Sequence, residues 1–497
     1  MPFNTSDLFA IAPEISLLVI ASAVLLVELF FTRKASVLQG ITIAGLLAAS
    51  VITALTSVEF PTGAFNGMIA VDGFTTFLKV VLLGVAVLTT LMSRGYFEGS
   101  SFRHGEYYAL LLLTTIGMMV LAAATDLVTL FLGIETMSVG LYVLAGLRHD
   151  RPKSSEASLK YLLLGAFASG FLLYGMALLY GSTGGKTNFD EIAAAIARMG
   201  SETPGIMHAG VGLIMIGLLF KVAAVPFHFW APDVYQGAPT PVTAFMSAGP
   251  KAAAIAATIR LMGRALPDLS AAWGPALWVV AALTMTVGNI IAISQKDVKR
   301  MLAYSSISHA GYLLLAALAA SNSEVRESAA SGMLFYLAAY YLMNLGAFTV
   351  AILVSRGTEK GDYQIDDYQG LGGQKPMLAL AMMVFMISLA GIPPTAGFFG
   401  KLFVFSAAVK AGYIWLVVIA VLNSVVSAFY YLRLVVFMYM KPQTAPAGSM
   451  RAPASAIVIA FCALAIVALG LMPGGVRKLA NTGGSEVATP MPTVEER

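Results

Sequence analysis

Four ionisable residues interrupt long apolar stretches of the sequence, where a charge is costly. They are Glu135, Lys221, Lys251 and Lys401. A charged side chain at the centre of a membrane-spanning helix costs about 2.5 to 3.5 kcal/mol on insertion scales, so such residues commonly face a partner or water and mark paths for ions. Their types and positions therefore indicate proton transfer within a membrane.

All the cations in this set are lysines. An arginine keeps its charge under all accessible conditions, whereas a buried lysine can release its proton. A nearby carboxylate favours the charged form of a lysine, so movement or protonation of Glu135 would change the proton affinity of Lys221. This pair has the minimum composition of a proton relay that is switched by a neighbouring charge.

Each of these residues also has a structural interpretation. Glu135 and Lys221 could form a static ion pair that holds two helices in register. Lys251 lies close enough to the start of its apolar stretch to extend its ammonium to the interface. Lys401 could stand at the end of an interrupted helix and satisfy carbonyl groups there.

Two histidines and several charges nearer the ends of the apolar stretches are less specific. His228 and His309 are as consistent with hydrogen-bonded histidines inside a helix bundle as with members of a relay. The remaining charges are expected to extend their polar groups to the membrane interface. These are Glu14, Glu28, Lys79, Arg260 and Arg433.

The composition places these residues in an integral membrane protein. Of the 497 residues, 58% are hydrophobic and 11% are charged, and the mean hydropathy is +0.81, whereas a soluble domain is about 25% charged. A spanning helix needs about 20 mostly apolar residues. The sequence predicts fourteen spans, at residues 12–31, 36–57, 72–92, 107–124, 125–146, 155–181, 207–230, 242–265, 274–293, 298–319, 329–355, 377–408, 412–440 and 454–472.

Two of the predicted spans contain helix-breaking motifs. The seventh includes GLLFKVAAVPFHFW at 217–230, where Pro226 lacks a backbone donor, and the twelfth includes GIPPTAGFFG at 391–400. Up to the proline, Lys221 and His228 would share one helix face, because they are seven residues apart. Interrupted helices in corresponding places indicate an inverted-repeat transporter with a site near the membrane midplane.

The spacing of the two breaks predicts the domain organisation of an all-α membrane fold. They are five spans apart, and an odd separation reverses orientation, so spans 4–8 and 9–13 would form two inverted five-helix repeats. We expect a three-helix segment at 1–106, the repeats at 107–265 and 266–440, and a last span with a polar tail at 441–497. The tail after residue 472 is expected to be disordered.

The loops predict the orientation and exclude several classes of function. One set of alternating loops holds fifteen lysines and arginines and the other holds seven, which predicts that both termini face away from the cytoplasm. The loops are too short for a soluble catalytic domain. The single cysteine, Cys462, can form neither an intrachain disulfide nor an iron–sulfur cluster, and the net charge of +4 gives no support for a nucleic-acid surface.

Three motifs together indicate a family. They are FKVAAVPFHFWAPDVYQGAPTPVTAF at 220–245, QKDVKRMLAYSSISHAGY at 295–312 and LAGIPPTAGFFGKLFVF at 389–405. With the number and order of the spans, they resemble the antiporter-like subunits of respiratory complex I, which are related to subunits of multi-subunit cation/proton antiporters. The resemblance covers nearly the whole chain.

The resemblance implies roles for individual residues. Glu135, Lys221 and Lys251 match a membrane-embedded chain in the family, and Lys401 matches its terminal proton site. The lysine of the family's sixth span matches Lys160 in SLKYLLLGAFASGF. The lysine at 401 and the short C-terminal extension are most similar to the branch called subunit N.

The family implies a proton-translocating membrane subunit of NADH:quinone oxidoreductase, in a bacterial inner membrane rather than a mitochondrial one. Its partners would be lipids and other membrane-arm subunits, such as M, K, L and J. NADH, FMN, iron–sulfur clusters and quinone would bind to other subunits, with no cofactor or metal in this chain. A subunit of a sodium/proton antiporter of the Mrp type, or a purely structural membrane-arm subunit, are the alternatives.

Overall fold

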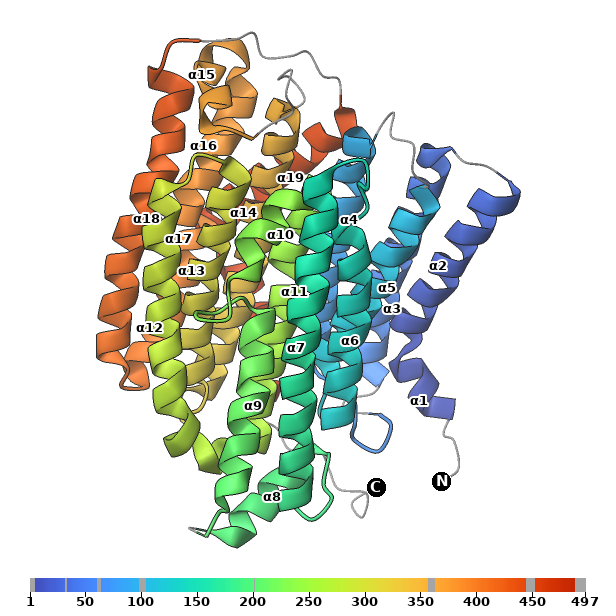
Figure 1. Ribbon diagram of the computed structural model, residues 1–497, viewed down its shortest axis with the longest axis vertical. Coiled ribbons are helices and arrows are strands. Elements are labelled where there is room, and N and C mark those ends of the chain that lie inside the picture. Colours follow the sequence, from blue (N-terminus) through green and yellow to red (C-terminus); the bar gives the residue numbers. More distant parts are fainter. Residues whose placement is uncertain are drawn as a thin grey trace.

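A computed structural model describes residues 5–31, 34–59, 64–97, 104–200, 202–355, 363–443 and 452–487, and every regular element within these ranges is a helix (Figure 1). The elements are α1 (Thr5–Ala10), α2 (Ala12–Phe30), α3 (Ala35–Glu59), α4 (Gly73–Phe97), α5 (His104–Ala123), α6 (Leu127–Ala145), α7 (Pro152–Ser182), α8 (Phe189–Met199), α9 (Gly205–Lys221), α10 (Trp230–Gly237), α11 (Thr240–Arg260), η1 (Leu261–Ala265), η2 (Pro267–Leu269), α12 (Ser270–Ser294), α13 (Val298–Ala319), α14 (Arg326–Ser355), η3 (Ile365–Tyr368), α15 (Leu371–Gln374), α16 (Pro376–Ala390), α17 (Ala396–Lys410), α18 (Ile414–Met440), α19 (Pro453–Leu471) and α20 (Gly474–Glu486).

The helices form because a bilayer offers no water to the backbone, so each amide and carbonyl must find its partner within the segment. Within the described residues, twelve helices are long and apolar enough to span a membrane. The pairs α9/α10 and α16/α17 replace the predicted seventh and twelfth spans. Together they give the fourteen predicted crossings, and the all-helical membrane fold is confirmed.

Both predicted breaks are present. α9 ends at Lys221 and α10 begins at Trp230, while α16 ends at Ala390, where Gly391 adopts a φ of +83°. Figure 1 shows α9 below α10 and α16 above α17, so the interrupted spans run in opposite directions. This is the orientation expected of inverted repeats, whereas the repeat boundaries remain a prediction.

The prediction that Lys221 and His228 share a helix face was wrong. The helix ends at Lys221 itself, and His228 lies in the connecting segment. Within that segment, the Val225 amide donates to Thr284 Oγ1 on α12 at 2.9 Å. The Trp230 indole at the start of α10 donates to the Phe220 carbonyl of α9 at 3.1 Å, so a side chain links the two half-helices across the break.

The tail was also predicted wrongly. Residues 474–486 form α20, which packs on α14 and α4. Ala480, Gly483 and Gly484 are buried along one side of it, and a Cβ at Gly484 would overlap the side chain of Ser331. Small residues that suggest disorder in the sequence here permit close helix contact. Residues 488–497 of the predicted tail lie outside the described part of the chain.

Several charges that were expected to reach the interface are paired inside the bundle. Lys79 forms an ion pair with Glu14 at 2.7 Å, with both side chains buried. Arg260 donates two hydrogen bonds to Asp72, at 2.7 and 3.0 Å. Burial alone would raise the pKa of Asp72, but the Arg260 charge and its hydrogen bonds hold that pKa below the ordinary value. The pair therefore keeps its charge in mildly acidic solution, and it joins the start of α4 to the end of α11.

Glu28 and Arg433 likewise bind backbone groups of other helices. Glu28 accepts a hydrogen bond from the Gly105 amide at 3.0 Å, at the beginning of α5. Arg433 donates to the carbonyls of Ile293 and Gln295 at the end of α12. A carboxylate at a helix start and a guanidinium at a helix end both complement the helix dipole.

The packing of α19 against the second break gives a test of the fold. A Cβ at Gly470 would overlap the Pro394 carbonyl oxygen. We expect Gly470→Ala to lower the free energy of unfolding by about 1 to 3 kcal/mol, the usual cost of overpacking, as measured by thermal unfolding of the full chain in detergent. Gly212→Ala on α9 is the control, because a Cβ there meets nothing within 4 Å. Equal stability of the two variants would contradict this packing.

Candidate functional site

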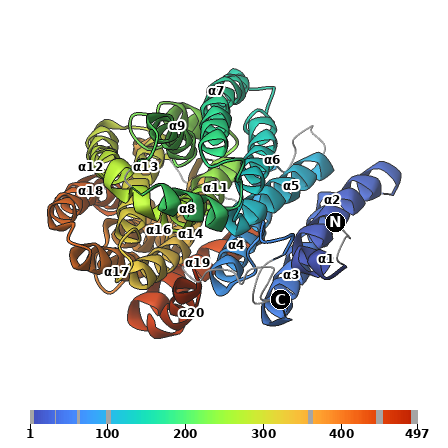
Figure 2. The same ribbon diagram turned by 90° about the horizontal axis from the view of Figure 1, so that it is seen from below.

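The site is built around α11 and α13, the two most deeply buried spans. The most apolar stretch of each helix is entirely buried within the bundle. Figure 2 shows both helices surrounded by others. Lys251 lies on α11 and His309 on α13. The breaks of the two interrupted spans bring Lys221 and Lys401 to the same bundle.

Lys221 binds hydroxyl groups of α6. Its ammonium donates to Ser138 Oγ at 2.7 Å and to the Tyr142 hydroxyl at 3.5 Å. Glu135 lies one turn before Ser138 on the same helix and accepts a hydrogen bond from Ser169 Oγ on α7. Glu135 and Lys221 do not form a direct ion pair, so the static pair considered above is not present. One helical turn, with Ser138 at its end, separates their charges.

Lys251 does not reach an interface. Only 1% of the residue is exposed, and its ammonium donates to the carbonyl and the hydroxyl of Ser306 on α13. It also lies 5.8 Å from the ring centre of Tyr235. The interfacial interpretation of Lys251 is therefore wrong, because its hydrogen-bonding partners lie inside the protein.

Lys401 bridges the second break. Its ammonium donates to the carbonyls of Leu389 and Ala390, at 3.1 and 2.9 Å, and to Ser424 Oγ at 2.8 Å. These carbonyls are at the end of α16, so the lysine satisfies a broken helix end, as its structural interpretation expected. The same ammonium lies 5.1 Å from the ring centre of Tyr312 on α13.

His309 stands in a cluster of tyrosines. Its Nδ1 is 2.6 Å from the Tyr336 hydroxyl, and its Nε2 is 3.2 Å from the Tyr431 hydroxyl. The ring of Tyr340 lies 5.0 Å from the imidazole, centre to centre. Both ring nitrogens therefore face a hydroxyl that can donate or accept a proton.

One face of α13 connects Lys251 with Lys401. Ser306, His309 and Tyr312 follow at intervals of three residues, and side chains three apart are neighbours on a helix. Ser306 binds Lys251 at one end of this face, and Tyr312 lies beneath Lys401 at the other. The structure thus brings three predicted residues together.

Glu135 and Lys221 lie outside this row, and so do the other two predicted residues, His228 and Lys160. His228 is buried in the first break, and its Nδ1 has no hydrogen-bond partner among the described residues. Lys160 is on the surface, with 40% of its side chain exposed, and forms ion pairs with Glu156 at 2.6 Å and Asp233 at 2.9 Å. Lys160 was named because it matches the lysine of the family's sixth span, but it is not one of the buried lysines.

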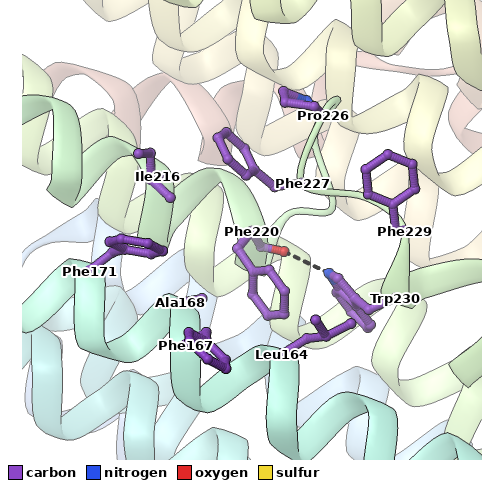
Figure 3. Close-up of a pocket in the computed structure, with 10 residues that line it drawn as sticks. All are labelled: Leu164, Phe167, Ala168, Phe171, Ile216, Phe220, Pro226, Phe227, Phe229 and Trp230. Carbon is purple, nitrogen blue, oxygen red and sulfur yellow. Dashed lines mark hydrogen bonds between the residues drawn. The ribbon is translucent and has the colours of Figure 1, made fainter.

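An apolar cavity of about 350 Å³ lies beside the first break, between α7, α9 and the connecting segment (Figure 3). Phe167, Phe171 and Phe227 line it. The Trp230 indole also lines the cavity, but its N–H already donates a hydrogen bond to the Phe220 carbonyl. None of its lining side chains is ionisable. This side of the break is therefore unsuited to carrying protons.

Lys299 is a further buried lysine that the sequence did not single out as a candidate site residue. It is 2% exposed and donates to the carbonyls of Gln236 and Ala238 at the end of α10, at 3.2 and 2.7 Å. The Asp297 cap shows that Lys299 lies in the first turn of α13, but its burial depends on α10. The tyrosines around His309 were also missed, although the spacing of Ser306 and Tyr312 from His309 was visible in the sequence.

Asp233 fastens the half-helix α10 to two neighbours. Its carboxylate accepts from Lys160 on α7 at 2.9 Å and from Arg300 on α13 at 2.7 Å. This connection lies near the basic loops, at the end of the bundle that holds α15, which we call the α15 end; α8 marks the opposite end, the α8 end (Figure 1). Across the described residues, no three His, Cys, Asp or Glu side chains are grouped as a metal site would require.

Comparison with known proteins gives the class of this chain. A family model described as NADH:quinone oxidoreductase/Mrp antiporter, TM, matches residues 124–427, which include the helices that carry the site. A chain of respiratory complex I from Thermus thermophilus with bound Aureothin shares 36% identity at a TM-score of 0.78, covering 94% of this chain and 99% of that one. A chain of the Mrp complex from Dietzia sp. shares the fold, with a TM-score of 0.86 at 21% identity over 99% of each chain.

Curated relatives define the branch. NADH-quinone oxidoreductase subunit N of Trichlorobacter lovleyi is 50% identical over 88% of this chain and 89% of that protein. The protein of the same name from Desulfovibrio desulfuricans is 45% identical over 94% and 95%. The chain therefore belongs to the subunit N family of NADH-quinone oxidoreductase, the multi-pass membrane subunits of bacterial complex I. The family predicted from the three motifs is confirmed.

The Asp233 connection predicts a local change in α10. Asp233→Asn should weaken both ion pairs by about 1 kcal/mol in total, because they are partly exposed, and should speed amide hydrogen exchange in residues 230–237 about fivefold. Asp190→Asn is the matched control, since Asp190 has a similar exposure and also binds an arginine, Arg264. Unchanged exchange in 230–237 would show that the ion pairs do not hold α10.

Proposed function

We propose that this chain moves protons across the membrane through Lys221, Lys251, His309 and Lys401, driven by electron transfer in other subunits of complex I. The observation that carries the proposal is the row on α13, which connects two buried lysines by way of a histidine. Hydroxyl, imidazole and ammonium groups can all take up and release protons, so the row has the chemistry that a relay needs.

The partners of the three lysines support this role. Within the described residues, Lys221, Lys251 and Lys401 donate only to hydroxyls and carbonyls. A carboxylate in direct contact would favour the charged lysine and oppose release of its proton. Lysines held by neutral groups can exchange a proton without breaking an ion pair.

Glu135 supplies the switching charge in this proposal. It is separated from Lys221 by one turn of α6, close enough for its charge to act through a low-dielectric interior. A change in its position or protonation would alter proton binding at Lys221. Lys221 then passes a proton toward Lys251, with His228 as a secondary member at the break, and Lys401 exchanges it with the far side.

Lys160 belongs to the surface of the proposed path. It pairs with Glu156 and Asp233 at the α15 end, which the excess of basic loops assigns to the cytoplasm. We place it where protons approach the bundle. The α8 end, which also holds α1 and α20, would then face the periplasm (Figure 1).

The same proposal gives the chain no redox role. NADH, FMN, iron–sulfur clusters and quinone would bind elsewhere in the complex, and the membrane-arm subunits M, K, L and J would be its partners. The relatives that carry the name of subunit N favour this assembly over an Mrp-type antiporter. Two sets of variants distinguish a proton relay from a purely structural role for the buried charges.

Lys221→Ala should abolish coupled proton pumping by the assembled complex, because the relay loses its first cation. Reduction of ferricyanide by NADH should persist, since it depends on other subunits. Co-purification of the variant chain with those subunits would report that the complex assembles. The control is the double variant Lys79→Met with Glu14→Gln, which neutralises a buried ion pair outside the relay. Normal pumping by Lys221→Ala would contradict the proposal, and equal loss in the control would favour a structural role.

Tyr336→Phe tests the histidine in the row. It removes the hydroxyl 2.6 Å from His309 Nδ1 while keeping the ring. We expect pumping to fall about tenfold, which corresponds to about 1.4 kcal/mol in the barrier. Tyr341→Phe, on the same helix but without a contact to His309, should pump normally. If both variants pump equally well, His309 is a structural histidine.

A further inference from the structure

A second cavity, of about 390 Å³, opens at the α8 end between α14, α17 and α20. Its lining includes Leu402 on α17, which follows Lys401 of the lysine row, and it is completed by α20, the helix that the sequence did not predict. Its rim carries Ser328 on α14 and Asn481 on α20. The cavity has a polar mouth formed by three separate helices.

Two cations line this cavity. Lys410 is the last residue of α17, and Arg477 lies in the first turn of α20. The Arg477 guanidinium is 4.5 Å from the ring centre of Phe403, which orients it over the cavity wall. No acidic side chain lines the cavity, and neither cation forms an ion pair within the described residues. Two positive charges therefore share one cavity without a counter-charge.

The cavity changes from polar to apolar with depth. Lys410 ends α17, whereas Leu402 and Phe403 precede it by about two helical turns. A rise of 1.5 Å per residue places Leu402 about 12 Å deeper than Lys410 along the helix. The exposed cations thus lie at the membrane–water boundary, and the apolar wall extends toward the hydrocarbon core.

We propose that this cavity binds the headgroup phosphate of an anionic phospholipid, with the first acyl carbons lying along Leu402 and Phe403. A phosphate ester offers the oxygens that a guanidinium, an ammonium and neighbouring hydroxyls bind. Phospholipid headgroups carry such phosphates at the membrane–water boundary, so the ligand is present wherever the protein is in a membrane. A zwitterionic headgroup fits less well, because its own cation would lie beside Lys410 and Arg477.

The test is native mass spectrometry of the full chain in detergent with added phosphatidylglycerol or phosphatidylcholine. We expect one phosphatidylglycerol to bind more tightly than phosphatidylcholine. The double variant Arg477→Gln with Lys410→Gln should weaken that binding roughly thirtyfold, since each interfacial cation contributes about fivefold to anionic lipid binding. Lys478→Gln, on the next residue of α20 but outside the cavity lining, should bind as the native chain does.

Three results would overturn the proposal. Equal binding of the two lipids would show that charge does not select the ligand. Unchanged binding in the double variant, with a native melting temperature, would place the lipid elsewhere. Displacement of phosphatidylglycerol by millimolar inorganic phosphate would indicate a site for free phosphate. The whole complex can also be purified with the native chain or with the double variant. One fewer phosphatidylglycerol per complex in the variant would support the lipid site. None of these results depends on proton pumping.

Discussion

The requirement that every backbone polar group in a bilayer find a protein partner governs the rest of this structure. Two spans are interrupted, and each interruption leaves carbonyls and amides that must be satisfied at membrane depth. Trp230 and Thr284 serve the first break, and Lys401 serves the second. The groups that repair the breaks are therefore close to the groups that can carry protons, so the fold and the candidate site share the same residues.

The buried charges divide into two kinds by their partners. Arg260 with Asp72, and Lys79 with Glu14, are direct ion pairs between helices. Removing one member of such a pair would leave an uncompensated buried charge, so these pairs hold the helices in place. The lysines of the row instead bind hydroxyls and carbonyls. This difference separates charges that hold the bundle together from charges that are able to exchange protons.

The incorrect predictions share a cause. Glu14 and Lys79 were expected to extend toward the interface because each was judged from its own apolar stretch, whereas the partner lies on another helix. α20 was expected to be disordered because its glycines and polar residues lack a strong helical pattern. Contact with α14 and α4 supplies the stabilisation that local propensity does not. The cavity that we assign to a phospholipid headgroup exists because this helix is folded.

The membrane class, the number of spans, the two breaks and the family were all predictable from the amino-acid sequence, because apolar length, proline position and short motifs are local properties. The sequence also identified Lys221, Lys251 and Lys401 by the cost of placing charge in an apolar stretch. The folded chain was needed to show what each lysine contacts, that Glu135 and Lys221 form no direct ion pair, and that Ser306, His309 and Tyr312 join two of the lysines. Those contacts form between helices that are far apart in the chain, and no spacing within one helix specifies them.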